Sequence, residues 1–340
     1  MHHFQFSSQK PQDVSTGGYR IRATKSNFPA LQNMSIYKLV LNPKAIREPH
    51  WHANADELGY CLKGQLIVSF YADENKKETF IISAGDVFLI PQGSLHSIEN
   101  LGKDTAELVL QFSNEEPEDF GLSMAVGMFT NAVLGNTWAV PSDHFQAIKR
   151  PLDETFIAVL NDSSNVDNTN RYLSSYQFSL ESTFPLIENN GGSAKVARQN
   201  VWPVLIRQAV YSLLLTNKGM REPHWHPETA ELGYVRSGKG RMSILSPNGN
   251  IDTYVMNEGD IYFVPKAYPH HIENLGPEDL NIVIFFDQPM PQDIGFTGSV
   301  KSFSNDVLGA VLHTSSETFA ELPIYYEDQF IVKRLNQLDS

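Results

Sequence analysis

The chain has 340 residues, with 41% hydrophobic residues and a net charge of −13, which suits a globular protein with more than one domain. This acidic balance disfavours binding to nucleic acid and to anionic membranes, because both select for basic surfaces. The sequence lacks an apolar run of the roughly 18 residues that cross a bilayer, a secretory signal and, with Cys61 as its single cysteine, an internal disulfide, so we expect a cytoplasmic protein.

The first half of the chain is predicted to be mostly β. Apolar and polar residues alternate over residues 35–41, 65–71 and 106–112, and Gly, Pro and Asn interrupt the pattern between these segments. Short strands separated in this way are typical of a β-sandwich or barrel. Residues 126–134 have a more helical pattern, so we expect a small helical tail after the strands.

A polar segment follows at residues 161–170, whose Asn, Asp and Ser content is that of a solvated linker. The β-rich pattern then returns and ends in a helical pattern at residues 300–312, with another turn or two at 316–322. We therefore predict two domains, residues 1–160 and 171–340, which the linker at 161–170 joins.

One six-residue string occurs twice in the chain. The string Arg-Glu-Pro-His-Trp-His spans residues 47–52 and recurs 174 positions later at residues 221–226. The same spacing relates three histidines and one glutamate in each copy: His50, His52, Glu57 and His96 in the first, and His224, His226, Glu231 and His270 in the second. The chain thus contains two copies of one domain.

These residues have the pattern of metal ligands. Alternate residues of a strand face the same side, so His50 and His52 point together. Glu57, beyond a short turn, and His96, on a later strand, can face the same interior. Isolated histidines are more often hydrogen-bonded core or surface residues, but random placement would not repeat a fixed spacing. Each set therefore predicts a divalent metal site, with the carboxylate favouring harder ions.

The motifs resemble those of the cupin superfamily, Gly-x5-His-x-His-x4-Glu-x6-Gly followed by Gly-x5-Pro-x-Gly-x2-His-x3-Asn. Both copies lack the initial glycine, and Ala267 replaces the glycine of the second motif in the second copy. The doubled arrangement, with Arg-Glu-x-His-Trp-His in each half, is most similar to the bicupin oxalate decarboxylases. The resemblance covers roughly residues 17–160 and 171–334. It implies an all-β fold of two tandem double-stranded β-helix (jelly-roll) barrels with short C-terminal helices.

The resemblance also implies a function. The family binds manganese and cleaves oxalate, a small carboxylic acid, to formate and carbon dioxide, with dioxygen mediating a reversible one-electron oxidation. We therefore expect a lyase with two divalent ions per chain, Mn(II) before Fe, Ni or Zn. Relatives form trimers and hexamers through their helical tails, so a homo-oligomer is expected.

Two arginines are candidates for substrate binding. Arg47 and Arg221 lie three residues before the first ligand of each set, which places them on the opposite strand face unless Pro49 or Pro223 introduces a bulge. In the oxalate decarboxylases the matching arginine reaches the substrate carboxylate, a role that a guanidinium suits. The alternative is a salt bridge to the adjacent glutamate or to another surface acid.

The proton donor of that family is a glutamate in a Ser-Glu-Asn-Ser string, on a mobile lid after the last barrel strand. The string is absent here, and the equivalent residues, 114–121, place Glu118 or its neighbour Asp119 at the glutamate position. The second copy has Gln292 and Asp293 instead. If one domain is catalytic, the first is predicted, with Glu118 as the general acid. The alternative is that Glu118 is a solvated loop residue.

Two other functions stay open. The changed lid favours an oxalate oxidase or another cupin dioxygenase, which would yield peroxide or consume oxygen without forming formate. The near-symmetry of the two sites fits a bicupin that is not an enzyme and stores metal or binds a ligand.

Overall fold

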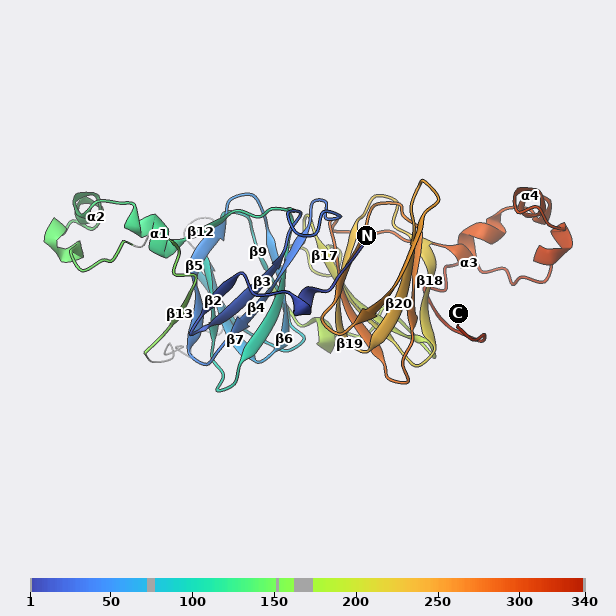
Figure 1. Ribbon diagram of the computed structural model, residues 1–340, viewed down its shortest axis with the longest axis horizontal. Helices are drawn as coiled ribbons and strands as arrows, with labels where there is room; N and C mark the ends of the chain where they lie inside the picture. The colour runs from blue at the N-terminus through green and yellow to red at the C-terminus, as the bar shows by residue number, and fades with distance from the viewer. Residues whose placement is uncertain (1, 72–76, 151–152, 162–173, 339–340) are drawn as a thin grey trace. The chain divides into compact units, whose positions relative to one another are not determined.

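The computed structural model describes residues 2–71, 77–150, 153–161 and 174–338. The chain divides into two compact units, a first unit of Gln9–Ser179 and a second unit of Met1–Ser8 with Leu180–Ser340. Each unit is a pair of antiparallel sheets around an apolar core (Figure 1). The predicted all-β fold of two barrels is confirmed.

The strands of the first unit are β2 (Asp13–Ser15), β3 (Gly18–Ala23), β4 (Ser35–Leu41), β5 (Ala45–His52), β6 (Glu57–Lys63), β7 (Gln65–Tyr71), β8 (Lys77–Ser83), β9 (Val87–Ile90), β10 (His96–Asn100), β11 (Ala106–Phe112), β12 (Asp119–Gly121), β13 (Ile157–Val159) and β14 (Gln177–Phe178). One sheet has the order β14-β9-β6-β11-β4-β3-β2. The other has the order β12-β5-β10-β7-β8, with β13 also paired to β5.

The strands of the second unit are β1 (His3–Phe4), β15 (Ile187–Asn189), β16 (Gly192–Ala197), β17 (Ala209–Leu215), β18 (Gly219–Trp225), β19 (Glu231–Ser237), β20 (Lys239–Leu245), β21 (Ile251–Asn257), β22 (Ile261–Val264), β23 (His270–Asn274), β24 (Leu280–Phe286), β25 (Ile294–Gly295) and β26 (Ile331–Lys333). Their sheet orders are β1-β22-β19-β24-β17-β16-β15 and β21-β20-β23-β18-β25, with β26 paired to β18. The two units thus have the same topology.

Three strands form where the alternating pattern predicts them, since residues 35–41, 65–71 and 106–112 are β4, β7 and β11. Their apolar residues enter the core of the first unit, as Leu66, Val68 and Phe70 of β7 do. A one-residue shift in register would turn these side chains to the other face, so core burial fixes the register.

The α-helices lie between β12 and β13 in the first unit and between β25 and β26 in the second (Figure 1). They are α1 (Leu122–Gly127), α2 (Asn131–Trp138), α3 (Phe296–Ser299) and α4 (Asn305–Val311), with short 3-10 helices at Phe6–Ser8, Ser142–Phe145, Leu180–Ser182, Val300–Ser302 and Ser316–Phe319. The helical segments expected at 126–134 and 300–312 are each interrupted, whereas the turn expected at 316–322 forms at Ser316–Phe319. The side chains of Thr130 and Ser304 accept hydrogen bonds from Val133 and Val307 and so begin new helices. No helix in the described ranges has the length and apolar character to span a membrane.

Two short strands at equivalent positions of the repeat, β1 and β14, extend the sheets. β1 pairs with β22 of the second unit, where the His3 ring lies 3.0 Å from the Asp260 carboxylate, and β14 pairs with β9 of the first. The compact units therefore differ at their ends from the predicted domains 1–160 and 171–340, because strand pairing rather than chain order assigns these ends. Apart from Asn161, the predicted linker at 161–170 lies outside the described residues.

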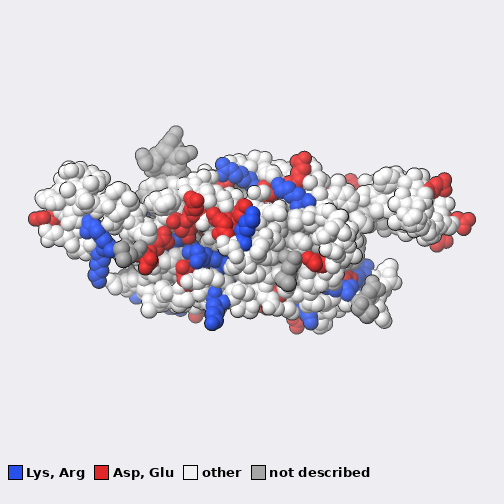
Figure 2. All heavy atoms as spheres, turned by 45° about the horizontal axis from the view of Figure 1, so that its top comes forward, with Lys and Arg blue, Asp and Glu red and all other residues white. Residues whose placement is uncertain are grey.

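Charged residues are scattered over the face of the molecule shown in Figure 2. Lysine and arginine side chains are interspersed there with aspartate and glutamate, and most of that surface carries neither. The net charge of −13 is therefore not gathered into one patch on that face.

Candidate metal centres

The four predicted ligands of the first unit lie together and form the first site. His50 and His52 are alternate residues of β5, Glu57 begins β6 and His96 begins β10. All four side chains are buried, and one ligand atom from each lies within 4.8 Å of the others. Strand alternation and sheet pairing, which places His96 opposite His50, bring them to one face.

The second unit repeats this arrangement in the second site. His224 belongs to β18, His226 follows it directly, and Glu231 and His270 begin β19 and β23. The four ligand atoms again lie within 4.8 Å of one another, and all four residues are buried.

Backbone carbonyl groups fix the orientation of the histidine rings. The Nδ1 atoms of His50 and His96 lie 2.8 Å from the carbonyl oxygens of Glu48 and Ser94. The matching rings of the second site make the same contacts. A proton on Nδ1 leaves the lone pair of Nε2 free to bind a metal.

The first site fits a divalent cation. Within the described part of the chain, the buried Oε1 atom of Glu57 has no hydrogen-bond partner, and its Oε2 atom lies 2.9 Å and 3.2 Å from the Nε2 atoms of His52 and His96. Burial raises the pKa of Glu57, but the charge of His96 and hydrogen bonds from both rings outweigh it and lower the pKa to about 2. Burial and the nearby Arg47 hold the pKa of His50 well below its usual value. Glu57 is thus ionised and His50 neutral, as metal binding requires, and His52, whose pKa is raised to about 9, would release a proton when the metal binds.

A bulge turns Arg47 towards the first site. Opposite β10, the pairing changes from His96 with His50 to Ile98 with Arg47, so one extra residue is accommodated in β5. Arg47 is consequently buried on the same face as His50. The neighbouring Glu48 is not its ion-pair partner, because that carboxylate accepts hydrogen bonds from the backbone N–H groups of Ser123 and Phe156. The pairing of β18 with β23 shifts in the same way before His224.

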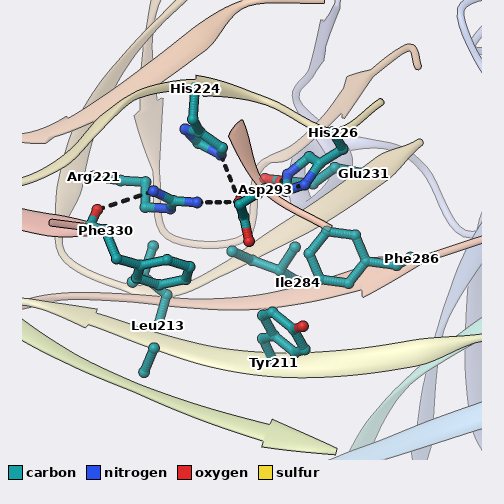
Figure 3. Close-up of a pocket in the computed structure, with 11 residues that line it drawn as sticks. Tyr211, Leu213, Arg221, His224, His226, Glu231, Ile284, Phe286, Asp293 and Phe330 are labelled. Carbon is teal, nitrogen blue, oxygen red and sulfur yellow. Dashed lines mark hydrogen bonds and ion pairs between the residues drawn. The ribbon is translucent and has the colours of Figure 1, made fainter. Parts of the chain in front are cut away.

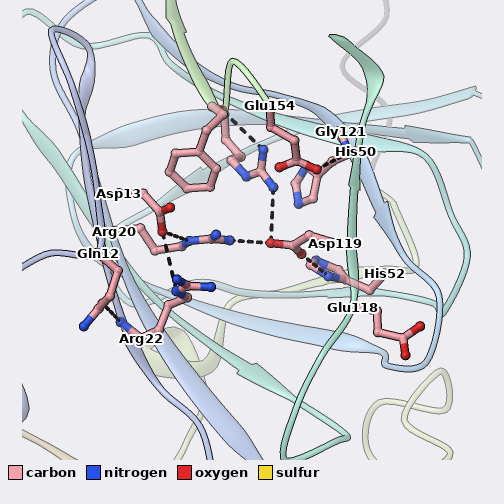
Figure 4. A network of polar contacts seen from close by, with 12 residues as sticks. Gln12, Asp13, Arg20, Arg22, His50, His52, Glu118, Asp119, Gly121 and Glu154 are labelled. Carbon is pink, nitrogen blue, oxygen red and sulfur yellow. Dashed lines mark hydrogen bonds and ion pairs between the residues drawn. The ribbon is translucent and has the colours of Figure 1, made fainter. Parts of the chain in front are cut away.

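Asp119 connects the arginines of the first site to a ligand (Figure 4). Its carboxylate lies 2.6 Å from the Nδ1 atom of His52, 2.6 Å from a guanidinium nitrogen of Arg20 and 3.6 Å from one of Arg47. Burial raises the pKa of Asp119, but His52 and the two arginines outweigh it and hold the pKa well below its usual range. Burial alone would lower the pKa of His52, but hydrogen bonds to Asp119 and Glu57 outweigh it and raise the pKa to about 9.

Glu118 does not join this network. It is exposed, and in Figure 4 its side chain points away from Asp119. The reason is local, because β12 pairs Asp119 with His52 and successive residues along an extended chain face opposite sides. Its predicted role as the general acid stays a prediction.

The second site has its own acid–arginine pair. Arg221 donates a hydrogen bond to Asp293, whose carboxylate lies 3.4 Å from the Nδ1 atom of His226 (Figure 3). That Nδ1 atom is 2.9 Å from the backbone carbonyl of Gln292, so the Gln292 main chain, not its side chain, orients the ring. Three of the four predicted catalytic residues, Arg47, Asp119 and Arg221, thus lie beside a ligand cluster.

Two residues of these sites have no part in the sequence-based prediction. Arg20 reaches Asp119 in the first site, and the hydroxyl of Tyr262 donates to the Oε1 atom of Glu231 at 2.6 Å in the second. Both stand where the two copies differ, with Ala194 matching Arg20 and Phe88 matching Tyr262. A comparison of unlike positions between the copies would have found them.

The comparisons with known proteins agree with this geometry. The cupin family model matches residues 4–146 and again residues 178–319. The chain is 28% identical to oxalate decarboxylase OxdC of Bacillus subtilis (strain 168), over 86% of this chain and 76% of that protein. It is 25% identical to a probable oxalate decarboxylase of Arthroderma benhamiae, over 93% and 79%. A solved structure of the Bacillus subtilis oxalate decarboxylase, studied for its Mn(II) centres, superposes with a TM-score of 0.87 at 26% identity and covers 98% of this chain and 89% of that one.

Proposed function

This chain belongs to the cupin family, and on that premise we propose that it is a manganese-dependent enzyme that cleaves oxalate to formate and carbon dioxide. The observation that carries the proposal is the pair of buried clusters of three histidines and one glutamate, each with an arginine beside it. The similarity to oxalate decarboxylases over most of both chains supports the same reaction. The 174-residue register supports an origin of the two halves by internal duplication.

The residues around each site suit this chemistry. The imidazoles and the glutamate would hold the metal, which supplies a Lewis-acidic position and a one-electron redox partner. Arg47 or Arg221 would bind the carboxylate that the metal does not hold, because a guanidinium matches a carboxylate in shape and charge. Cleavage breaks the C–C bond of the oxalate dianion and releases carbon dioxide, and the remaining carbon keeps the bonding electron pair and takes up one proton to give formate.

That proton needs a donor at the site. Asp119 and Asp293 are the acids nearest to the clusters, at 2.6 Å and 3.4 Å from ligand rings. Glu118 could act only if its exposed side chain turned inward. We propose that the acid beside the occupied site delivers this proton, and that Asp119, whose pKa is held well below its usual range, must first take one up.

Product analysis tests this function. Manganese-loaded protein is incubated with oxalate in air at mildly acidic pH, and formate, hydrogen peroxide and oxygen consumption are measured. The matched control is the His52→Ala/His226→Ala variant, which should bind no manganese and form no product. Formate from the wild type alone supports a decarboxylase, and no product from either protein contradicts an oxalate enzyme.

An oxidase is the second candidate, and the residues after β11 favour it. The segment 114–121 lacks the family's acidic lid string, and Glu118 is exposed. In the experiment above, peroxide in place of formate would identify this activity.

We further propose that the protein is a cytoplasmic homo-oligomer, a trimer or a hexamer. The segments that contain the helices expose apolar side chains, among them Met128, Trp138 and Val311. A buried single cysteine fits a reducing compartment. Light scattering coupled to size-exclusion chromatography tests the assembly, and a monomer at micromolar concentration would contradict it.

A further inference from the structure

The two sites differ in one residue that lies beside the ligands. In the first unit this residue is Arg20 of β3, and its counterpart in β16 of the second unit is Ala194. The register is the same in both, because Arg20 pairs with Leu39 and Ala194 pairs with Leu213, 174 positions later. Both residues are buried, with exposed fractions of 5% and 1%. A guanidinium in one unit therefore stands where the other has a methyl group.

Arg20 is held in place from several sides. Its Nε atom donates to Asp13 at 2.9 Å, and another guanidinium nitrogen lies 2.6 Å from Asp119. The guanidinium carbon lies 4.0 Å from the ring centre of Phe156 and 4.9 Å from that of Tyr37. The group is thus satisfied by charge, hydrogen bonds and aromatic stacking.

The second unit has a cavity at the corresponding place (Figure 3). Ala194, Tyr211, Asp293 and Phe330 line it, together with ligands of the second site. The last three of these are the counterparts of Tyr37, Asp119 and Phe156, which surround Arg20. The cavity volume of about 10 Å³ holds one water-sized group as the side chains stand. In the first unit, the Arg20 guanidinium lies against the counterparts of these three residues.

Charge does not distinguish the two sites. The first has Arg20, Arg22 and Arg47 against Asp13 and Asp119, and the second has Arg198 and Arg221 against Asp293. Each set carries one net positive charge, so the attraction for an anion is similar. The available space is what differs.

We propose that the second site admits the small carboxylic acid, and that Arg20 closes the first site, which then binds metal without substrate. Arg20 is accordingly a specificity-determining residue that acts by filling the substrate space and by holding Asp119 in place. The identity of the acid as oxalate rests on the proposed function. This assignment places Arg221 and Asp293 at the substrate, and it opposes the prediction that Glu118 of the first copy is the general acid.

Single-site proteins test the proposal without turnover. His226→Ala leaves manganese in the first site alone, and His52→Ala leaves it in the second alone. Oxalate is added to each protein in the absence of oxygen, and the Mn(II) electron paramagnetic resonance spectrum is recorded, with sulfate as the control anion. We expect oxalate to change the spectrum of the second site at a concentration at least about tenfold below that needed at the first. An equal or stronger response at the first site, or no response at either, overturns the proposal.

Exchange of the differing residues sharpens this test. In the His226→Ala background, Asp13→Ile/Arg20→Ala copies the second unit and should give the first site an oxalate response. In the His52→Ala background, Ile187→Asp/Ala194→Arg copies the first unit and should abolish the response. If one exchange does not fold, the other decides, and an unchanged response in a folded exchange overturns the role of Arg20.

The outcome separates this inference from the proposed function. Oxalate binding at the second site without formate from the wild type would leave the inference standing and remove the decarboxylase. Formate from the wild type, with oxalate perturbing the first site, would support the decarboxylase and contradict the inference about Arg20.

Discussion

The two ligand clusters of this chain share their ligands but not the residues that hold them. The Oε1 atom of Glu57 has no partner within the described ranges, while that of Glu231 accepts a hydrogen bond from Tyr262. The Nδ1 atom of His52 lies 2.6 Å from the Asp119 carboxylate, whereas that of His226 lies 2.9 Å from a backbone carbonyl and 3.4 Å from the Asp293 carboxylate. Strand register therefore reproduces a cluster faithfully, while residues outside it can give each copy a different environment.

The largest expected effect distinguishes the sites by metal content. His52→Ala should reduce the metal bound from two ions per chain to one, because it removes a ligand of the first site only. Metal analysis after desalting measures this, and His226→Ala is the matched variant for the second site. Two ions still bound to either variant would contradict the ligand assignment.

Replacement of the aspartate beside each cluster, Asp119 or Asp293, should destabilise the first unit more than the second. Asp119→Asn leaves Arg20 and Arg47 buried without their shared partner, which costs about 3–5 kcal/mol. Asp293→Asn leaves only Arg221 without its partner, so it should lower the free energy of unfolding by less. Denaturant unfolding of the metal-free proteins compares them, and equal losses would contradict the role of Asp119 as the common partner.

The pH dependence of that loss has a definite sign. The pKa of Asp119 is held well below its usual range, so its stabilising contribution is present above the unfolded value of about 3.9 and is lost as the pH falls. Wild type and Asp119→Asn should therefore differ most near neutral pH, and the difference should begin to shrink as the pH falls below about 4. A difference that grows on acidification would contradict this.

Tyr262→Phe should make the second site resemble the first. It removes the hydroxyl that donates to Glu231, a hydrogen bond to a charged group that is worth about 2 kcal/mol. Thermal unfolding of the metal-free protein measures the loss. Tyr254→Phe is the control, because that hydroxyl contacts only the sulfur of Met242 at 3.0 Å among the partners described for it. Equal effects of the two substitutions would argue against a specific role of Tyr262.

The smallest expected effect concerns a turn beside each cluster. Gly93 has φ of 77° and Ala267 has φ of 62°, and their N–H groups donate to the carbonyls of His52 and His226 at 2.9 Å and 2.8 Å. Only Gly93 adopts this left-handed conformation without strain. Gly93→Ala should destabilise the first unit by about 1 kcal/mol, and Ala267→Gly should stabilise the second by up to about 1 kcal/mol. Unfolding measurements that gave the same sign for both would contradict this.

The sequence alone determined the architecture and the two clusters of candidate ligands. Alternation located β4, β7 and β11, because a half-buried strand needs a period of two. The repeated spacing identified both ligand sets, since His50 and His52 must share a face of any regular strand. These are short-range consequences of strand geometry, so they can be read from neighbouring residues.

Tertiary structure alone decided what surrounds the ligands. The bulge in β5 turned Arg47 inward, and the pairing of β12 with β5 selected Asp119 over Glu118. Arg20 meets Asp119 across 99 positions of sequence. Contacts of this kind depend on which strands become neighbours and in which register, and no local pattern of residue types contains that information.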